Sequence, residues 1–308
     1  MTAAPRARPR LWLFNLDAEL ELARESGRYQ TRLPVARALA PMLERAQALM
    51  APGDTSLDPL APPRRAPAGV MAAVTASGER RLGCAWCPTP SALERLSRAG
   101  AELEPCPSVE LLRRVNHRRF AIELGGGAPG ARFVSDESAL AAALAEPWET
   151  WLFKRAHSFA GRGQRRIIGT PSKDDRRWLA DSLRLGGFVA EPWLELVLEV
   201  GLHGLIEPSG CFALGRPCVQ ETNEYRAWVS TRLAHAGELS SEQVSRLEQR
   251  AKQVATALIA AGYFGPFGID AYLFRTRSGA IELNPLSELN ARYSMGFATG
   301  RPEFPIAR

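Results

Sequence analysis

The sequence has 308 residues, of which 45% are hydrophobic and 23% charged, so it can form a core and is not a disordered chain. Its net charge of +6 comes from 36 arginines and three lysines set against 33 acidic residues. The basic residues are scattered and no aromatic residues alternate with them, which argues against a nucleic-acid-binding surface. Because no run of 18 apolar residues and no signal peptide is found, we expect a cytoplasmic protein without a membrane segment.

Five cysteines are an odd number in a chain too long to need disulfide staples, which is typical of a reducing compartment. Cys84 and Cys87 have the spacing of a redox or zinc-binding pair. A zinc site would need a second pair or histidines at ligand spacing, and none is found. We interpret both as structural cysteines at the end of a buried strand, with a redox pair as the alternative.

The first 110 residues alternate apolar runs with helical periodicity, which predicts a doubly wound α/β domain. The polar segment Leu16-Asp17-Ala18-Glu19 follows the first apolar run and predicts a loop, with possible polar contacts of a substrate near Asn15 and Asp17. The expected elements are a strand at 10–15, a helix at 35–50, a loop at 51–69, apolar segments at 70–74 and 82–86, and a helix at 91–98.

The rest of the chain alternates helices with strands that are too short for one large parallel sheet, which predicts two small α+β lobes. The expected helices are 108–124, 138–145, 173–185 and 240–261, the last with strong periodicity. The expected strands are 131–134, 151–154, a strand ending at 168, 187–194, 196–206, and the pair 269–274 and 280–289.

Lys154 ends an apolar strand and precedes the segment Ser158 to Gly163, which contains Gly161. A lysine that faces a glycine-bearing loop suits phosphate binding, because the ammonium supplies a point charge and glycine lets backbone N–H groups approach an anion. A hairpin with a surface lysine is the alternative. A second segment, Glu191-Pro-Trp193-Leu194, describes a strand that runs into a linker.

A possible metal site follows near the carboxyl end of the chain. Asp270 lies in an apolar strand, and Glu288, Asn290 and Arg292 occupy alternate positions of the next one, which places these three on one face. Hard oxygen ligands beside a cation match a magnesium site that also holds phosphates.

In this order and spacing the segments resemble the ATP-grasp family of carboxylate–amine ligases, over residues 108–298. The resemblance implies an N-terminal domain at 1–110, an ATP lid lobe at 111–190 and a metal-binding lobe at 191–308. It implies these roles: Lys154 on the α- or β-phosphate; Ser158, Gly161 and Gly163 in the lid loop; Glu191, Trp193 and Leu194 around adenine; Glu199 on the ribose; Asp270, Glu288 and Asn290 on Mg²⁺ or Mn²⁺; and Arg292 on the transferring phosphate.

Two positions stay open. The family's first lysine is replaced by His117, Arg118 or Arg119, of which Arg118 is our choice. Glu282-Leu-Asn284 also has the Glu-x-Asn spacing, but a turn at Ser278-Gly279 would place Asp270 opposite a residue near 287, which favours Glu288.

The resemblance implies an enzyme that uses ATP and Mg²⁺ to activate a small-molecule acid as an acyl phosphate and joins it to an amine, with a homodimer as a common assembly. An ATP-binding regulatory protein without turnover is the alternative from another class. The identity of the acid and of the amine is not specified by any motif.

Overall fold

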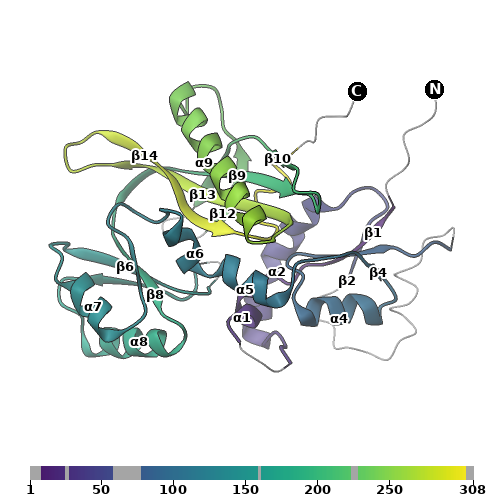
Figure 1. Ribbon diagram of the computed structural model, residues 1–308, viewed down its shortest axis with the longest axis horizontal. Helices are drawn as coiled ribbons and strands as arrows, with labels where there is room; N and C mark the ends of the chain where they lie inside the picture. Colours follow the sequence, from purple (N-terminus) through teal and green to yellow (C-terminus); the bar gives the residue numbers. More distant parts are fainter. Residues whose placement is uncertain (1–7, 25–27, 58–77, 159–160, 223–227, 303–308) are drawn as a thin grey trace. The chain divides into compact units, whose positions relative to one another are not determined.

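The computed structural model describes residues 8–24, 28–57, 78–158, 161–222 and 228–302 (Figure 1). The chain divides into two compact units, Met1–Val109 and Glu110–Arg308. Helices and strands occur in both, so the mixed α/β class is as expected. Within the described ranges, no helix is both long enough and apolar enough to cross a membrane.

The first unit contains a parallel sheet in the order β2-β1-β3-β4. The core of this unit joins the sheet to α4, because Leu11 and Leu13 of β1 pack with Leu96 of α4. The strands are β1 (Arg10–Leu13), β2 (Thr55–Leu57), β3 (Leu82–Ala85) and β4 (Glu102–Leu103). The helices are α1 (Ala18–Leu22), α2 (Leu33–Ala46), the 3-10 helix Gln47–Leu49 and α4 (Pro90–Arg98).

Two expectations for this unit are wrong in detail. The segment after β1 begins helix α1 at Ala18 instead of continuing as a loop. The segment 51–69, expected to be a loop, contains β2, whose short Thr-Ser-Leu sequence has no apolar pattern and is extended through its pairing with β1. The apolar segment 70–74 lies outside the described residues, so the doubly wound arrangement stays a prediction.

The cysteine pair begins at the end of a strand, as expected. Cys84 lies on β3, opposite Trp12 of β1, and Cys87 is buried just after the strand. No disulfide joins cysteines of the described residues.

The second unit contains two sheets. The first has the antiparallel order β5-β8-β6-β7, and helices α7 and α8 lie along it (Figure 1). Its core joins Trp151 and Phe153 of β6 to Leu179 of α8. The elements are β5 (Arg132–Val134), α7 (Glu137–Leu144), β6 (Thr150–Arg155), β7 (Gln164–Ile168), α8 (Lys173–Arg184) and β8 (Phe188–Pro192).

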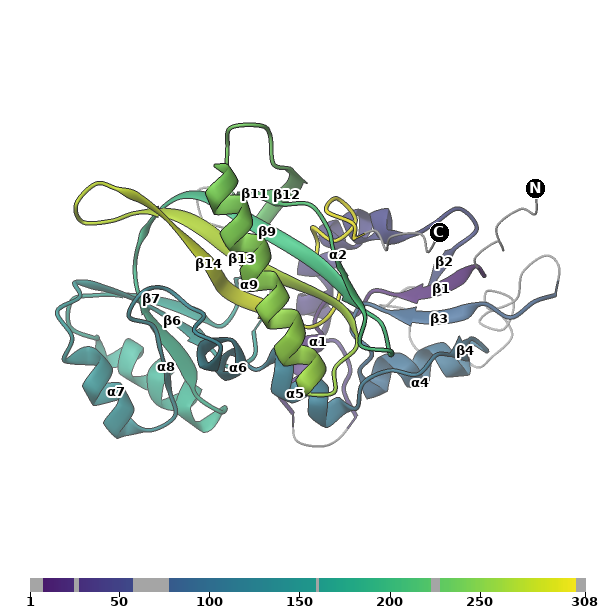
Figure 2. The ribbon, with the colours of Figure 1, turned by 45° about the horizontal axis from the view of Figure 1, so that its top comes forward.

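The second sheet of this unit has the antiparallel order β12-β11-β9-β13-β14, with β10 paired to β9. Helix α9 packs across β9 and β14, as Figure 2 shows. Strands β10 to β12 were not expected from the sequence. The elements are β9 (Glu195–Ile206), β10 (Phe212–Leu214), β11 (Cys218–Thr222), β12 (Trp228–Leu233), α9 (Ser241–Ala260), β13 (Gly265–Arg275) and β14 (Ile281–Asn290).

The helix expected at 108–124 is interrupted. It forms α5 (Val109–Asn116) and α6 (Arg118–Glu123), with His117 in an extended conformation between them. The His117 side chain accepts a hydrogen bond from the backbone N–H of Arg119 at 3.2 Å and so caps α6. This interruption matters because α6 contacts strands of both sheets, β14 on one side and β5 and β8 on the other.

The capping box at the start of α9 gives a stability test. The Ser240 side chain accepts from the N–H of Gln243, whose side chain accepts in turn from the N–H of Ser240. We expect Ser240→Ala to lower the free energy of unfolding by about 1 kcal/mol in chemical denaturation, because the first turn loses a side-chain acceptor. Ser245→Ala, an exposed change inside the same helix, should stay within about 0.5 kcal/mol of the parent. Equal losses would contradict a role for the cap.

Candidate active site

A cleft of about 150 Å³ lies between the two sheets of the second unit. One side is formed by β6 and β8, which contribute Lys154 and Glu191, and the other by β9, β13 and β14, which contribute Glu199, Asp270 and Glu288. With Trp193 and Leu194, seven of the candidate site residues therefore line one cleft.

The register of the β13–β14 hairpin places two carboxylates side by side. Asp270 pairs directly with Glu288, whereas Glu282 pairs with Phe274 and is exposed. The register shifts between Asp270 and Tyr272, so that β14 contains additional residues at this point. Directly paired side chains in an antiparallel sheet lie within about 5.5 Å of one another, and like charges at that spacing repel.

Asp270 is held by two neutral amides. Its Oδ1 accepts from Nε2 of Gln220 at 2.6 Å, and its Oδ2 accepts from Nδ2 of Asn290 at 3.1 Å. Gly201 lies opposite Asp270 on β9, and a Cβ there would be 3.1 Å from Nε2 of Gln220, so glycine leaves room for this contact. Burial, followed by the charge of Glu288, raises the pKa of Asp270 to about 6.

Arg118 is the cation that reaches this pair. Its guanidinium lies 2.8 Å from Oε1 of Glu288, with 10% and 25% of the two side chains exposed. The neighbouring candidates point elsewhere: His117 caps α6, and the Arg119 guanidinium lies over the Phe133 ring at 4.5 Å. The structure therefore brings Arg118, the residue we chose, beside the carboxylates.

Arg292 is linked to the same cluster through Asn290. One of its guanidinium nitrogens donates to Oδ1 of Asn290 at 2.9 Å, and another donates to the carbonyl of Tyr293 at 2.8 Å. Arg292 is 8% exposed and is not among the residues that line the cleft. Hydrogen bonds thus run from Gln220 through Asp270 and Asn290 to Arg292.

The other Glu-x-Asn pair has a different environment. Glu282 is exposed, and Nδ2 of Asn284 donates to the carbonyl of Gly127 at 2.9 Å, which ties β14 to the loop after α6. Asn284 therefore has a structural contact, and the carboxylate beside Asp270 belongs to Glu288.

Lys154 and Glu191 form an ion pair across neighbouring strands. Nζ of Lys154 lies 2.5 Å from Oε1 of Glu191, and only 13% and 6% of the side chains are exposed. Trp193 and Leu194 line the cleft next to this pair, and the guanidinium of Arg166 lies 4.1 Å from the centre of the Trp193 ring. Glu199 lines the cleft on β9 and accepts from the Thr222 hydroxyl at 3.0 Å.

The glycine-bearing loop follows β6. Gly161 and Gly163 both have positive φ, 71° and 70°, and a Cβ on Gly163 would lie 2.9 Å from Cβ of Ser158. The Ser158 hydroxyl is buried and has no hydrogen-bonding partner among the described residues. None of these three lines the cleft, and residues 159–160 of the loop lie outside the described residues.

Sequence reasoning missed Gln220, which contacts Asp270 directly. Strand β11, which carries it, was not expected, and a lone glutamine followed by Glu-Thr has no motif around it. Only the position of β11 next to β9 brings it to the site.

The donor set at Asp270 fits a divalent cation that also contacts phosphates. In the described part of the chain, no three His, Cys, Asp or Glu side chains cluster as a protein-only metal site would require. Two paired carboxylates match Mg²⁺ instead, which is bound through one or two carboxylates together with phosphate oxygens. Asn290 directs its amide nitrogen at Asp270 and its oxygen at Arg292, so it would have to turn to bind the ion through its oxygen. Burial and the charge of Glu288 raise the pKa of Asp270, and the cation beside the pair is Arg118, which contacts Glu288.

The fold matches those of several solved structures. No protein-family model and no curated protein sequence matches the chain. Among solved structures, biotin carboxylase from Campylobacter jejuni matches with a TM-score of 0.57 at 13% identity, over 96% of this chain and 72% of that one. N5-carboxyaminoimidazole ribonucleotide synthetase from Thermus thermophilus gives 0.51 at 17% identity, over 92% and 71%. D-alanyl-alanine synthetase A from Vibrio cholerae gives 0.50 at 13% identity, over 93% and 89%.

These structures belong to ATP-grasp ligases, and at such low identities the match establishes the fold alone. The chain has the ATP-grasp fold, and the resemblance inferred from the order of its motifs is confirmed at that level.

The Asp270–Glu288 pair predicts a pH dependence of stability. An acid whose pKa is raised by folding, here from 3.8 to about 6, binds its proton more tightly in the folded state. Stability contributed by Asp270 is therefore present below about pH 4 and is lost as the pH rises to about 6. We expect this decline in the free energy of unfolding to be smaller by about 1–2 kcal/mol in Asp270→Asn, less than the full shift implies because water reaches the cleft.

Urea denaturation over this pH range measures the decline. Glu282→Gln is the matched control, because it removes an exposed carboxylate from the same hairpin and should leave the pH profile unchanged. Identical profiles for Asp270→Asn and the parent protein would contradict the prediction.

Proposed function

We propose that this chain is an ATP- and Mg²⁺-dependent ligase that activates a substrate carboxylate as an acyl phosphate and joins it to an amine. The observation that carries the proposal is the cleft in which the Asp270–Glu288 pair faces Lys154 and Glu191. The ATP-grasp fold of the chain and the ligase activities named for the matched structures support the same reaction class.

Lys154 would bind the α- or β-phosphate, with its ammonium moving from Glu191 to the phosphate. The observed cleft of about 150 Å³ is smaller than usual small-molecule sites, which begin at about 300 Å³, so binding requires this ion pair to open. Glu191, Trp193 and Leu194 would surround adenine, and Glu199 would hold the ribose hydroxyls. Ser158, Gly161 and Gly163 would close over the phosphates, where the buried Ser158 hydroxyl would gain a partner.

Asp270, Glu288 and Asn290 would hold Mg²⁺. The ion supplies charge neutralisation and Lewis-acid polarisation at the phosphates. Glu288 is already oriented by Arg118, and Asn290 by Arg292, so these ligands are held in place by their own hydrogen bonds. Arg118 and Arg292 would provide fixed positive charge for the phosphoryl group in transit.

In the proposed reaction, an oxygen of the substrate carboxylate attacks the γ-phosphorus of ATP and ADP leaves. The amine nitrogen then attacks the acyl carbon, the C–O bond to phosphate breaks, and the nitrogen loses a proton. The protein forms no covalent bond. Its contribution is to position the reactants and to stabilise negative charge.

The proposed domain roles follow the two sheets of the second unit. Residues 111–190 would form the lid lobe and 191–308 the metal-binding lobe, after an N-terminal domain at 1–110. The cytoplasmic location and the homodimer stay predictions.

Substitutions at the cleft test the ligase. We expect ADP release across a panel of acids and amines to fall at least about 100-fold in Lys154→Ala and Glu288→Ala, because each removes a charge that compensates the phosphates or the metal. Lys252→Ala on α9 and Glu282→Ala on the same hairpin are the charge-matched controls, and both should retain activity. Unchanged turnover in both cleft variants would contradict the assignment, whereas ATP binding without product in the parent protein would support a regulatory protein.

Metal binding can be measured without any substrate. We expect MgCl₂ at pH 8 to raise the melting temperature of the parent protein, because the ion relieves repulsion between Asp270 and Glu288. The shift should disappear in Asp270→Asn and persist in Glu282→Gln, as monitored by differential scanning fluorimetry. An equal shift in Asp270→Asn would place the ion elsewhere.

A further inference from the structure

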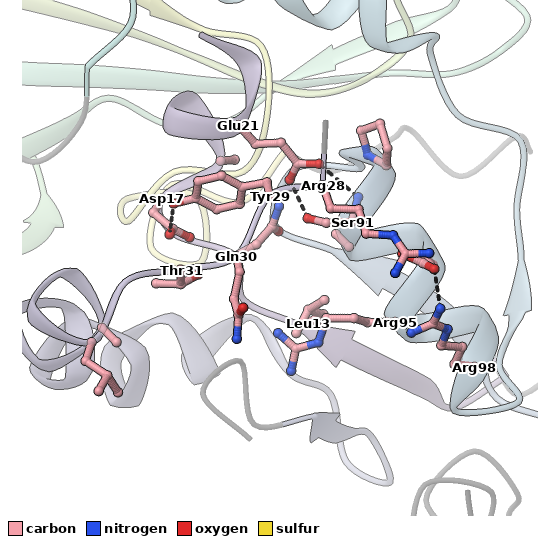
Figure 3. A pocket seen from close by; sticks show the side chains of 17 residues that line it. Leu13, Asp17, Glu21, Arg28, Tyr29, Gln30, Thr31, Ser91, Arg95 and Arg98 are labelled. Carbon is pink, nitrogen blue, oxygen red and sulfur yellow. Dashed lines mark hydrogen bonds and ion pairs between the residues drawn. The ribbon is translucent and has the colours of Figure 1, made fainter. Parts of the chain in front are cut away.

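A larger cavity, of about 610 Å³, lies within the first unit (Figure 3). It opens where β1 and β3 end, between Asn15 and Asp17 after β1 and Pro90 and Ser91 after β3. Because the chain adds β2 on one side of β1 and β3 on the other, this is the point where the strand order reverses. Open parallel sheets bind small molecules at such points, and the volume lies within the usual range of about 300–1,000 Å³.

Two buried carboxylates form one wall of the cavity, and both are held by neutral donors. Asp17 is 3% exposed, and its Oδ2 accepts a hydrogen bond from the Tyr29 hydroxyl. Glu21 is 7% exposed, and its two oxygens accept from the backbone N–H of Ser91, at 2.9 Å, and from the Ser91 hydroxyl. Neither forms an ion pair with a described residue, so no cation of the described residues is paired with these two buried carboxylates.

One carboxylate oxygen of Asp17, Oδ1, is available as a hydrogen-bond acceptor. It precedes α1 but makes no side-chain cap, and its Oδ1 accepts no hydrogen bond from the described residues. Since the residue lines the cavity, this oxygen is available to a donor inside it. A protonated amine supplies both the missing hydrogen bond and the missing positive charge.

Positive charge lies on another part of the wall. Arg95 and Arg98 come from α4, and Arg28 comes from the segment before Tyr29. Arg98 is paired with Glu94 at 2.5 Å. Figure 3 shows Arg95 directed along the cavity toward Gln30, away from Asp17 and Glu21. The cavity therefore has an acidic end and a basic end.

From this separation of charge we infer that the cavity binds a small molecule that carries both an ammonium group and a carboxylate, the class of the free amino acids. The ammonium contacts Asp17 beside Glu21, and the carboxylate contacts Arg95 with Gln30 nearby. A polyphosphate is a poor ligand here, because the buried carboxylates repel it. Such a ligand has both groups that the ligase joins. Its role as a substrate rests on the proposed function, whereas its binding to the cavity does not.

Binding of free amino acids to the full chain, without nucleotide, tests the inference. Each amino acid is compared by calorimetry with its N-acetyl derivative, which lacks the ammonium, and with its amide, which lacks the carboxylate. We expect at least one free amino acid to bind, and both of its derivatives to bind about 10- to 100-fold more weakly, as expected for the loss of a charge-assisted hydrogen bond. Failure of every free amino acid to bind, or equal binding of a derivative, would overturn the inference.

Variants then identify the two ends of the cavity. In Asp17→Asn, the affinity for the free amino acid should fall to that for its N-acetyl derivative, and the affinity for the derivative should not change. In Arg95→Gln, the affinity for the free amino acid should fall to that for its amide, and the affinity for the amide should not change. Glu44→Gln and Arg37→Gln are exposed charge-matched controls on α2 that do not line the cavity, and both should bind as the parent protein does. Parent-like affinity in both cavity variants would also overturn the inference.

The outcome is separable from that of the ligase assignment. Thermal stabilisation by ATP with MgCl₂, which reports on the second unit, should be the same in Asp17→Asn, Arg95→Gln and the parent protein. Circular dichroism spectra equal to that of the parent protein would confirm that the first unit of the variants is folded. Amino-acid binding without ATP-dependent turnover would preserve this inference and reject the ligase. ATP-dependent turnover without amino-acid binding in the first unit would do the reverse.

Discussion

The site depends on one like-charge pair, Asp270 opposite Glu288. The pair exists because of an irregularity in the hairpin: Tyr272 faces Asn284, yet Asp270, two residues earlier, faces Glu288, four residues later. The extra residues of β14 include Pro285, which has no N–H for the ladder and is tolerated at a bulge. In an uninterrupted hairpin the two carboxylates would not be paired, since each shift of register changes the partner of every side chain.

The residues around this pair orient both carboxylates but neutralise only part of their negative charge. Gln220 and Asn290 give Asp270 neutral hydrogen bonds, and Arg118 gives Glu288 a single cation. Burial and the charge of Glu288 raise the pKa of Asp270, so the folded protein favours the protonated form of this carboxyl group. A structural ion cluster would gain stability from a second arginine at Asp270. Here Arg292 donates to Asn290 instead, and Asp270 has only the neutral donors of Gln220 and Asn290.

The sequence predicts most of this site because its parts follow short-range rules. Symmetry about the turn at Ser278-Gly279 places the partner of Asp270 near residue 287, within one position of Glu288. The bulge, which adds two residues to β14, is not revealed by any local pattern. The choice among His117, Arg118 and Arg119 could not be made from periodicity, because the helix is interrupted at the residue in question and the interruption changes which side chain faces β14. Gln220 and β2 were missed for a related reason, since short strands at or near the edge of a sheet are extended by their neighbours rather than by their own sequence.

Each of the two cavities contains a pair of carboxylates, and the two pairs differ in the kind of cation that can neutralise them. At Asp270 the carboxylates face each other across paired strands, so a single compact divalent ion can contact both. At Asp17 and Glu21 each carboxylate is fixed by a hydroxyl or amide donor of its own, and both oxygens of Glu21 are occupied. An ammonium needs only the remaining acceptor of Asp17. With Arg95 on another part of the same wall, the chemistry of the first unit favours a dipolar organic ligand over a metal, and that of the second unit favours the reverse.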